Sequence, residues 1–253
     1  MNRVAITGLG TVNALGQDAA ATARALRQGH CAIGPLTTIP TDALQIKIGA
    51  EVAGFDPLGH FTEKRLSLLD RCSQLALVAA REAVTQCRLD FRGLPGRVAA
   101  IIGSGVGGMG TLDDGFHRLY AKGLARFPPM TIPRMMISAA VSHITMEHGI
   151  TGPAFTVASA CASANHAIGT AFQMVRAGAV DVAVTGGTES VFTLGTLKAW
   201  EAMRILAPDT CRPFSADRMG LVLGEGAAIL VLENYDHARA RGGPSWARLL
   251  ASA

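Results

Sequence analysis

The chain alternates short runs of apolar residues with longer segments in which apolar residues recur at helical spacing. The short runs predict strands at 4–8, 46–53, 98–103, 154–160, 180–187 and 227–233. Helices are expected over 64–87, 134–148 and 162–177, the last ending before Gly178. Strands that are apolar on both faces require a sheet covered by helices on both sides. We therefore expect a layered α/β fold.

The composition narrows the class of protein. With 49% hydrophobic and 17% charged residues, the 253-residue chain has ample material for a large core. No apolar run reaches the roughly 18 to 20 uncharged residues of a membrane-spanning helix. The N-terminal sequence "MNRVAITGLG" lacks the features of a secretory signal. We therefore expect a soluble, cytoplasmic protein without a membrane partner.

The charges and cysteines exclude further classes. The net charge is +4, and the 23 lysines and arginines are scattered, which argues against nucleic acid binding and leaves an acidic protein partner open. The five cysteines, at 31, 72, 87, 161 and 211, form neither a C-x-x-C pair nor an even framework. We expect no zinc site, no disulfide scaffold and mostly buried, reduced thiols.

Cys161 lies in "ASACASANHAIG", where a predicted strand runs directly into a predicted helix. A thiol at such a turn lies near helical N–H groups, which lower the pKa of a cysteine and favour the thiolate. The small residues around it leave room for a substrate. The alternative is that Cys161 is a small buried hydrophobe, as most free cysteines are.

No histidine is marked by the sequence as the base for Cys161. His166 is the nearest, but five residues along a helix is a rotation of about 140°, so the two side chains are expected to point apart. A cysteine–histidine mechanism would need a histidine that this sequence does not visibly supply.

Glycine-rich turns and carboxylates form the remaining candidates. "GSGVGG" at 103–108 matches G-x-G-x-x-G, but no acidic residue follows about 20 positions later, as a dinucleotide site would require. The alternative is a turn that lets another segment pass closely. "GLGTVNALG" at 8–16 is a weaker match. Glu189 and Glu225 each follow glycines near a strand edge, and hydrogen-bonded carboxylates in turns are favoured there over metal ligands.

Seven blocks together resemble the β-ketoacyl-[acyl-carrier-protein] synthases, the elongating type II condensing enzymes of fatty acid synthesis. The blocks are "RVAITGLGTVNALG", "DRCSQLALVAAREAV", "IIGSGVGGMGT", "ASACASANHAIGTAF", "DVAVTGGTES", "CRPFSADRMGLVLGEGAAILVLE" and "YDHARARG". They occur in family order and cover essentially the whole chain. Their number and order make the resemblance more specific than any single motif.

The resemblance implies a thiolase-like fold, with five αβαβα layers in the complete enzyme, and a homodimer. Residues 1–253 correspond to the N-terminal β-ketoacyl synthase domain. The C-terminal half, which in this family carries two catalytic histidines and a lysine, is absent from this chain, and no H-G-T motif of the family's kind occurs in it. The expected start of a further strand in "SWARLLASA" agrees with a larger folded unit.

Carried over by position, the resemblance makes Cys161 the acyl-accepting nucleophile, with its own backbone N–H as an oxyanion donor. Val106, Met109 and Trp200 match positions that line the acyl channel. Trp200 stands where relatives often have Phe, and Thr196 replaces a smaller residue, so the accepted acyl length is left open. The run "RILAPDTCRPFS" is similar to the nodulation-type branch.

The expected partner is an acyl carrier protein, received near Lys64, Arg65 and Arg204. The expected reaction is a decarboxylative Claisen condensation: an acyl group on Cys161 reacts with malonyl-carrier protein to give a β-ketoacyl product, with no cofactor and no metal. Three alternatives remain. They are a non-catalytic partner like a chain-length factor, an acyl-CoA-using thiolase or initiation enzyme, and an inactive half-enzyme that needs its C-terminal half.

Overall fold

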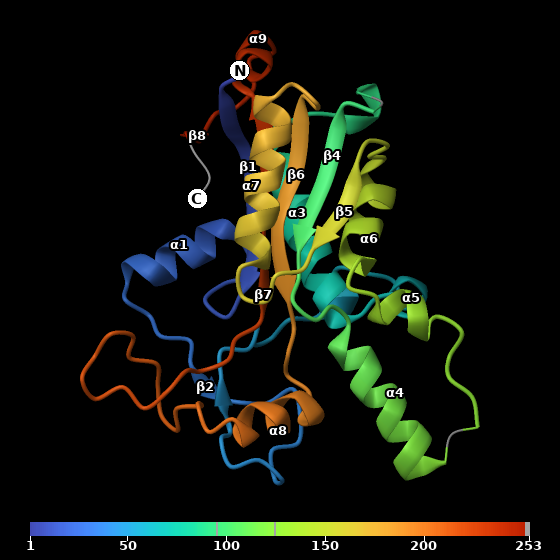
Figure 1. Cartoon of the computed structure of the whole chain (residues 1–253), viewed down its shortest axis with the longest axis vertical. Coiled ribbons are helices and arrows are strands. Elements are labelled where there is room, and N and C mark those ends of the chain that lie inside the picture. Colours follow the sequence, from blue (N-terminus) through green and yellow to red (C-terminus); the bar gives the residue numbers. More distant parts are fainter. Residues whose placement is uncertain (95, 124, 251–253) are drawn as a thin grey trace.

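A six-stranded mixed sheet forms the centre of the molecule in the computed structural model, which describes residues 1–94, 96–123 and 125–250 (Figure 1). The strand order is β5-β4-β6-β7-β1-β8. The bounds are β1 Val4–Asn13, β4 Val98–Gly103, β5 Ala154–Val157, β6 Val182–Glu189, β7 Gly226–Asn234 and β8 Ala247–Leu249. Five of the six predicted strands are thus present in this sheet, with shifted ends, and β8 confirms the strand expected near the end of the sequence.

The strand directions decide where a site can form. β4 runs parallel to both β5 and β6, while β7 is antiparallel to β6 and to β1. The register pairs Gly103 with Val157 on one side and with Gly187 on the other. The carboxyl ends of three neighbouring strands therefore meet at one edge, which is where α/β proteins usually place their ligands.

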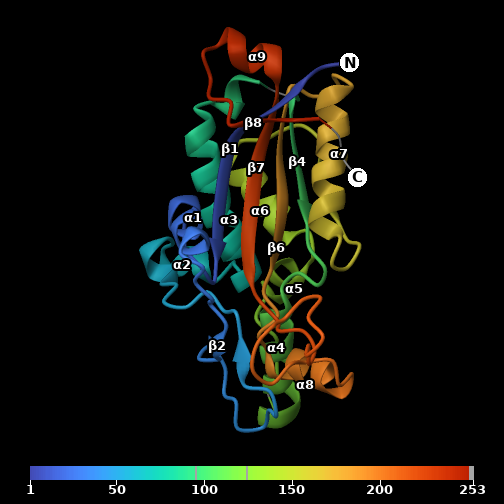
Figure 2. The ribbon, with the colours of Figure 1, turned by 90° about the vertical axis from the view of Figure 1, so that its left-hand side faces the viewer.

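Helices cover both faces of the sheet, as expected (Figure 2). α3 (Arg71–Cys87) and α6 (Ala139–His148) pack on one face, and α7 (Ser163–Arg176) packs on the other. β4 shows why both faces must be apolar, since Val98, Ala100 and Ile102 join the core on the α3 side. Ala99 and Ile101 join the core beneath α7. Each fully buried large aliphatic side chain contributes about 1.5–3 kcal/mol.

The "GLG" of β1 is a packing feature rather than a nucleotide loop. An ideal Cβ on Gly8 would lie 2.0 Å from the Ala83 carbonyl oxygen, and one on Gly10 would lie 2.1 Å from the Ala79 oxygen. Both glycines therefore let α3 lie directly on the strand. Their role is close approach between a helix and a sheet.

Two predicted helices are each interrupted. The prediction of one helix over 64–87 was wrong: α2 (Glu63–Leu66) ends, and α3 starts anew after Asp70, whose carboxylate accepts the Cys72 N–H. The helix expected over 134–148 is divided into α5 (Thr131–Met135) and α6, because Met136 between them is extended, with ψ 137°.

The strand predicted at 46–53 is reduced to β3 (Ile48–Gly49), paired with β2 (Gly34–Pro35). Beyond it, the Val52 N–H donates to a buried carboxylate instead of to a neighbouring strand. Gly178 follows α7 at φ 77°, as expected for the residue that ends a helix.

Four helices were not anticipated from the sequence: α1 (Ala19–Arg27), α4 (Met109–Lys122), α8 (Leu194–Ala202) and α9 (Tyr235–Ala240). The short helical turns η1 (Pro57–Gly59) and η2 (Phe91–Gly93) complete the described elements. α4 and α8 lie beyond the carboxyl ends of β4 and β6 (Figure 1). Within the described ranges, every helix is too short or too polar to cross a membrane.

Candidate functional site

The turn between β5 and α7 presents Cys161. Ala160, just before it, adopts a left-handed conformation with φ 53°, which costs a non-glycine residue roughly 1–2 kcal/mol. The Ser163 hydroxyl holds this turn, because it accepts the Ser159 N–H at 2.9 Å and donates to the Ala160 carbonyl at 2.7 Å. The strained residue is thus tied on both sides to the first residue of the helix.

Cys161 is exposed at the head of α7. The residue that caps this 14-residue helix is Ala162, which makes no side-chain hydrogen bond to the helix N–H groups. The partial positive charge of the helix end is therefore not neutralised by a side-chain cap. The alternative that Cys161 is a buried hydrophobe is wrong. His166 is also exposed, on α7.

The loop 104–107, which follows β4, packs against this turn. The Glu189 carboxylate at the end of β6 accepts the Gly105 N–H at 2.6 Å and the Val106 N–H at 3.3 Å. An ideal Cβ on Gly105 would lie 2.8 Å from that carboxylate and 3.8 Å from the Ala160 oxygen. The glycine-rich stretch 103–108 therefore lets other segments of the chain pass closely, which was the alternative to a dinucleotide site.

Two opposing effects act on the pKa of Glu189. Burial raises the pKa of Glu189, and the N–H groups of Gly105 and Val106 act in the opposite direction, with a net increase. Sequence reasoning placed this carboxylate in a turn but missed that the turn lies beside Cys161. The signal was present in two glycine-rich stretches at the ends of neighbouring strands.

A cavity of about 380 Å³ lies between α4 and α8. Its lining is mostly apolar: Met109, Leu112, Asp113, Phe116, Gly195, Thr196, Ala199, Trp200 and Met203. The structure thus brings together Met109 and Trp200, two of the three predicted channel residues, with Thr196, which the resemblance also placed in the pocket. Val106 and Cys161 lie outside this lining, and Val106, 43% exposed, lies on the loop between the thiol turn and α4.

The three predicted docking cations occupy separate elements. Lys64 is exposed on α2, and Arg65 beside it is half-buried, 3.9 Å from the Glu147 carboxylate. Arg204 is exposed just after α8, in a left-handed conformation with φ 57°. Figure 2 shows α2 and α8 on opposite sides of the molecule, so these cations do not form one compact patch.

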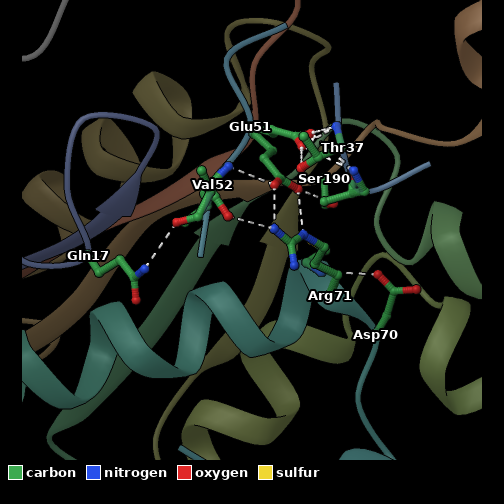
Figure 3. Close-up of polar contacts among 11 residues, drawn as sticks. Gln17, Thr37, Glu51, Val52, Asp70, Arg71 and Ser190 are labelled. Atoms are coloured by element: carbon green, nitrogen blue, oxygen red, sulfur yellow. Dashed lines mark hydrogen bonds and ion pairs between the residues drawn. The ribbon is translucent and has the colours of Figure 1, made fainter. Parts of the chain in front are cut away.

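Glu225 is the hub of a buried polar network at the start of β7. Its carboxylate receives Nη2 and Nε of Arg71 at 2.6 and 2.8 Å, the Ser190 hydroxyl at 2.7 Å and the Val52 N–H at 2.9 Å. Figure 3 labels three of its partners, Arg71, Val52 and Ser190, which lie close together. Burial lowers the pKa of Arg71, but the bond and charge of Glu225 outweigh this and raise it.

This network supports the interpretation of Glu225 as a hydrogen-bonded carboxylate in a turn. Next to it, the Glu51 carboxylate accepts the N–H and hydroxyl of Thr37 and of Thr38 (Figure 3). In the part of the chain that the structure describes, no three His, Cys, Asp or Glu side chains are grouped as metal ligands would be.

A mixed sheet between helical layers is the architecture of the thiolase-fold ketosynthases. The family model of the β-ketoacyl synthase N-terminal domain matches residues 1–238, and the chain belongs to this family.

The relatives point in two directions within it. Nodulation protein E of Rhizobium sp. (strain N33) is 47% identical over 242 residues, which cover 95% of this chain and 60% of that protein. The 3-oxoacyl-[acyl-carrier-protein] synthase 2 of Staphylococcus aureus (strain COL) is 35% identical over 254 residues, which cover 98% of this chain and 61% of that protein. The chain thus spans about 60% of the length of these curated relatives.

Among solved structures, the ishigamide ketosynthase/chain length factor superposes with a TM-score of 0.91 at 31% identity. The match covers 99% of this chain and 62% of that one. The described fold is therefore that of part of a ketosynthase chain.

Proposed function

We propose that this chain supplies the acyl-accepting part of a β-ketoacyl-[acyl-carrier-protein] synthase, with Cys161 as the nucleophile. The observation that carries the proposal is the exposed thiol at the head of α7, in a turn whose strained residue is held by Ser163. The thiol lies beside the N-terminal N–H groups of α7, which have no side-chain cap. Membership of the ketosynthase family supports the same role.

The reaction has two halves. The Cys161 thiolate attacks the carbonyl carbon of an acyl-carrier-protein thioester, and the carrier thiol leaves, so the acyl group is carried on the enzyme. Malonyl-carrier protein then loses carbon dioxide, and the resulting carbanion attacks the acyl carbonyl. The carbon–sulfur bond to Cys161 breaks, the thiolate is regenerated, and the product is a β-ketoacyl chain two carbons longer.

The acyl chain would occupy the cavity between α4 and α8. Its apolar lining, with Met109, Trp200 and Thr196, suits a hydrocarbon chain. Val106, on the loop between the thiol turn and α4, would lie along the path. The bulk of Trp200 and Thr196 would set the length of chain that fits.

An acyl carrier protein is the proposed donor, because its acidic surface suits exposed cations such as Lys64 and Arg204, with the half-buried Arg65 beside Lys64, although Arg204 lies on a separate element from the other two. We propose that the working enzyme is a homodimer and needs no organic cofactor, since decarboxylation supplies the carbanion. The length of acyl chain that the enzyme accepts would decide whether it serves fatty acid synthesis or a specialised acyl pathway.

A second candidate is a non-catalytic partner of a ketosynthase, because one of the most similar solved structures is named as a ketosynthase/chain length factor. Cys161 and its held turn support the catalytic role instead. A related alternative is that this stretch of sequence acts only together with the C-terminal half of a ketosynthase.

The test is transfer of a radiolabelled acyl group from acyl carrier protein to the chain, alone and as part of a full-length protein. Cys161→Ala should abolish labelling and reduce condensation with malonyl-carrier protein by at least about 10³-fold. Cys211→Ala, at another exposed cysteine, is the matched control and should change neither. Undiminished labelling of Cys161→Ala contradicts the proposal. If an unsubstituted full-length protein takes up no label at Cys161, the non-catalytic partner role is favoured.

A further inference from the structure

We propose that Glu189 is a positioning residue that holds the loop 104–107 against the Cys161 turn and so fixes the path of a chain leaving the thiol. In one respect this rests on the proposed function, namely that an acyl chain on Cys161 runs along the loop. The holding of the loop itself is independent of any reaction.

The contacts of Glu189 converge on consecutive residues. One carboxylate oxygen accepts the N–H of Gly105 at 2.6 Å and that of Val106 at 3.3 Å, and the other accepts the Ser104 hydroxyl at 3.4 Å. Ser104 in turn accepts the Gly107 N–H at 3.1 Å. A single side chain from β6 thus orders, directly or through Ser104, the backbone of the whole loop.

Glycines within the loop and on either side of it allow close packing against neighbouring backbone. An ideal Cβ on Gly103 would lie 2.4 Å from the Ser163 backbone at the start of α7. One on Gly107 would lie 2.7 Å from Ile137, and one on Gly108 would lie 2.3 Å from the Arg134 oxygen. Gly105 lies between Glu189 and Ala160. The loop is therefore wedged between the thiol turn and the segment before α6, and Glu189 is its polar anchor.

A carboxylate suits this position for an electrostatic reason. N–H groups that point inward at a turn form a concave site for an anion, and bonds to a charged acceptor are about twice as strong as neutral ones. The neighbouring Cys72 thiol adds no second negative charge that would repel the carboxylate, because burial raises its pKa to about 12 and it stays protonated. The loop N–H groups therefore offset part of the cost of burying the Glu189 charge, while burial still raises its pKa.

The position of the loop links the thiol to the cavity. Val106 is exposed on the loop, and three residues later Met109 begins α4 and lines the cavity. A loop released from Glu189 would let Val106 move across the route between Cys161 and α4. A small reagent at the thiol would be little affected, whereas a long chain would lose its track.

The experiment compares Glu189→Gln with Glu82→Gln. Glu82 is the matched control, because it also accepts two backbone N–H groups, from Thr11 and Ala19, each at 2.9 Å, but belongs to α3 beside β1 and α1. The first measurement is amide hydrogen exchange at Gly105 and Val106. The second is the rate of alkylation of Cys161 by iodoacetamide and by an N-dodecyl iodoacetamide, each relative to Cys211 in the same molecule.

In Glu189→Gln, exchange at Gly105 and Val106 should accelerate about tenfold or more, as expected when a bond worth about 1.4 kcal/mol is lost. The dodecyl reagent should lose its preference for Cys161 by a similar factor, while the iodoacetamide rate changes less than about twofold. Glu82→Gln should change none of these. Glu189→Asp keeps the charge one carbon shorter and serves as the second variant if the first does not fold.

Unchanged exchange at Gly105 and Val106 would overturn the holding role, and faster exchange with an unchanged dodecyl preference would overturn the role in the path. If the unsubstituted chain shows no dodecyl preference for Cys161, the proposed acyl acceptance fails instead. The exchange comparison then still decides whether Glu189 holds the loop.

Discussion

Two cysteines at the start of helices have opposite surroundings. Cys161 directly precedes the residue that caps α7, is exposed, and faces a helix end without a side-chain cap. Cys72 is the second residue of α3, is 2% exposed, and lies behind the Asp70 carboxylate that caps its helix. Burial, with Glu189 and Asp70 nearby, raises the pKa of Cys72 to about 12.

The comparison shows that a helix N-terminus does not by itself activate a thiol. Both α3 and α7 have the positive end of the helix dipole at the N-terminus. At Cys72, however, burial penalises the thiolate, and the capping carboxylate cancels the positive end. At Cys161 the thiol is exposed. Exposure and the missing cap, more than the helix, distinguish the candidate nucleophile from a core residue.

The largest expected difference is in alkylation. With a pKa of about 12, only about one Cys72 thiol in 10⁴ is ionised at pH 8. Iodoacetamide followed by peptide mass analysis should therefore modify Cys161 in the folded chain and leave Cys72 unmodified until urea unfolds it. Cys31 and Cys211, both exposed, report ordinary accessibility. Modification of Cys72 at the rate of Cys161 would remove the distinction.

The second effect concerns the anchor of α3. Arg71→Ala should cost about 3–5 kcal/mol of unfolding free energy, because it leaves the fully buried Glu225 carboxylate without its cation. Arg97→Ala breaks the more exposed pair with Asp181 and should cost about 0–1 kcal/mol. Urea unfolding of both variants gives the comparison. Equal losses would mean that the Arg71 pair does not fasten the helix end next to Cys72.

Removal of the Asp70 cap should make the start of α3 resemble that of α7. Asp70 accepts the Cys72 N–H at 3.1 Å and the N–H and hydroxyl of Thr111 at 2.8 and 2.7 Å. We expect Asp70→Ala to cost about 1–3 kcal/mol and to lower the pKa of Cys72, though not to an ordinary value, since burial persists. Asp18→Ala, at the exposed cap of α1, should cost less. A Cys72 titration unchanged by Asp70→Ala would contradict this account.

The raised pKa of Cys72 also predicts a stability change at alkaline pH. An unfolded thiol releases its proton near 9.0, whereas the folded chain retains it up to about pH 12. Between these values the folded state binds more protons, so the unfolding free energy falls as pH rises, by about 1.4 kcal/mol per pH unit. Cys72→Ala should lack this contribution. Parallel slopes for the two chains above pH 9 would show that Cys72 titrates normally.

The smallest effect is at the Cys161 turn itself. Ala160→Gly relieves a left-handed conformation at φ 53° but adds freedom to the unfolded chain, so we expect a net gain of about 0.5–1 kcal/mol. Ala121→Gly, at an exposed position of α4, should instead lose up to about 1 kcal/mol. Thermal unfolding measures both. Destabilisation by Ala160→Gly would mean that the turn stores no strain.

The sequence predicted what depends on local pattern. β4 coincides with its predicted range because all six of its residues are buried, and α7 is only one residue shorter at each end than its apolar spacing suggested. The break between α2 and α3 was missed because it is fixed by Asp70, whose carboxylate also binds Thr111 of α4, far along the chain. Local pattern did not reveal the cavity for a similar reason, since neither α4 nor α8 had been anticipated and their meeting is tertiary. Only the family resemblance placed Met109 and Trp200 together in a channel.

The two glycines of β1 carry a consequence for tolerance to mutation. An ideal Cβ at position 8 or 10 would meet the α3 backbone, whereas the alternation of a strand directs Leu9 between them to the opposite face. A library randomised over these three codons should return glycine almost alone at the outer two and a broad set of residues at the middle one. The absence of side chains at Gly8 and Gly10 thus sets the distance between α3 and the sheet. A design that aims to shift α3 should begin with these two positions.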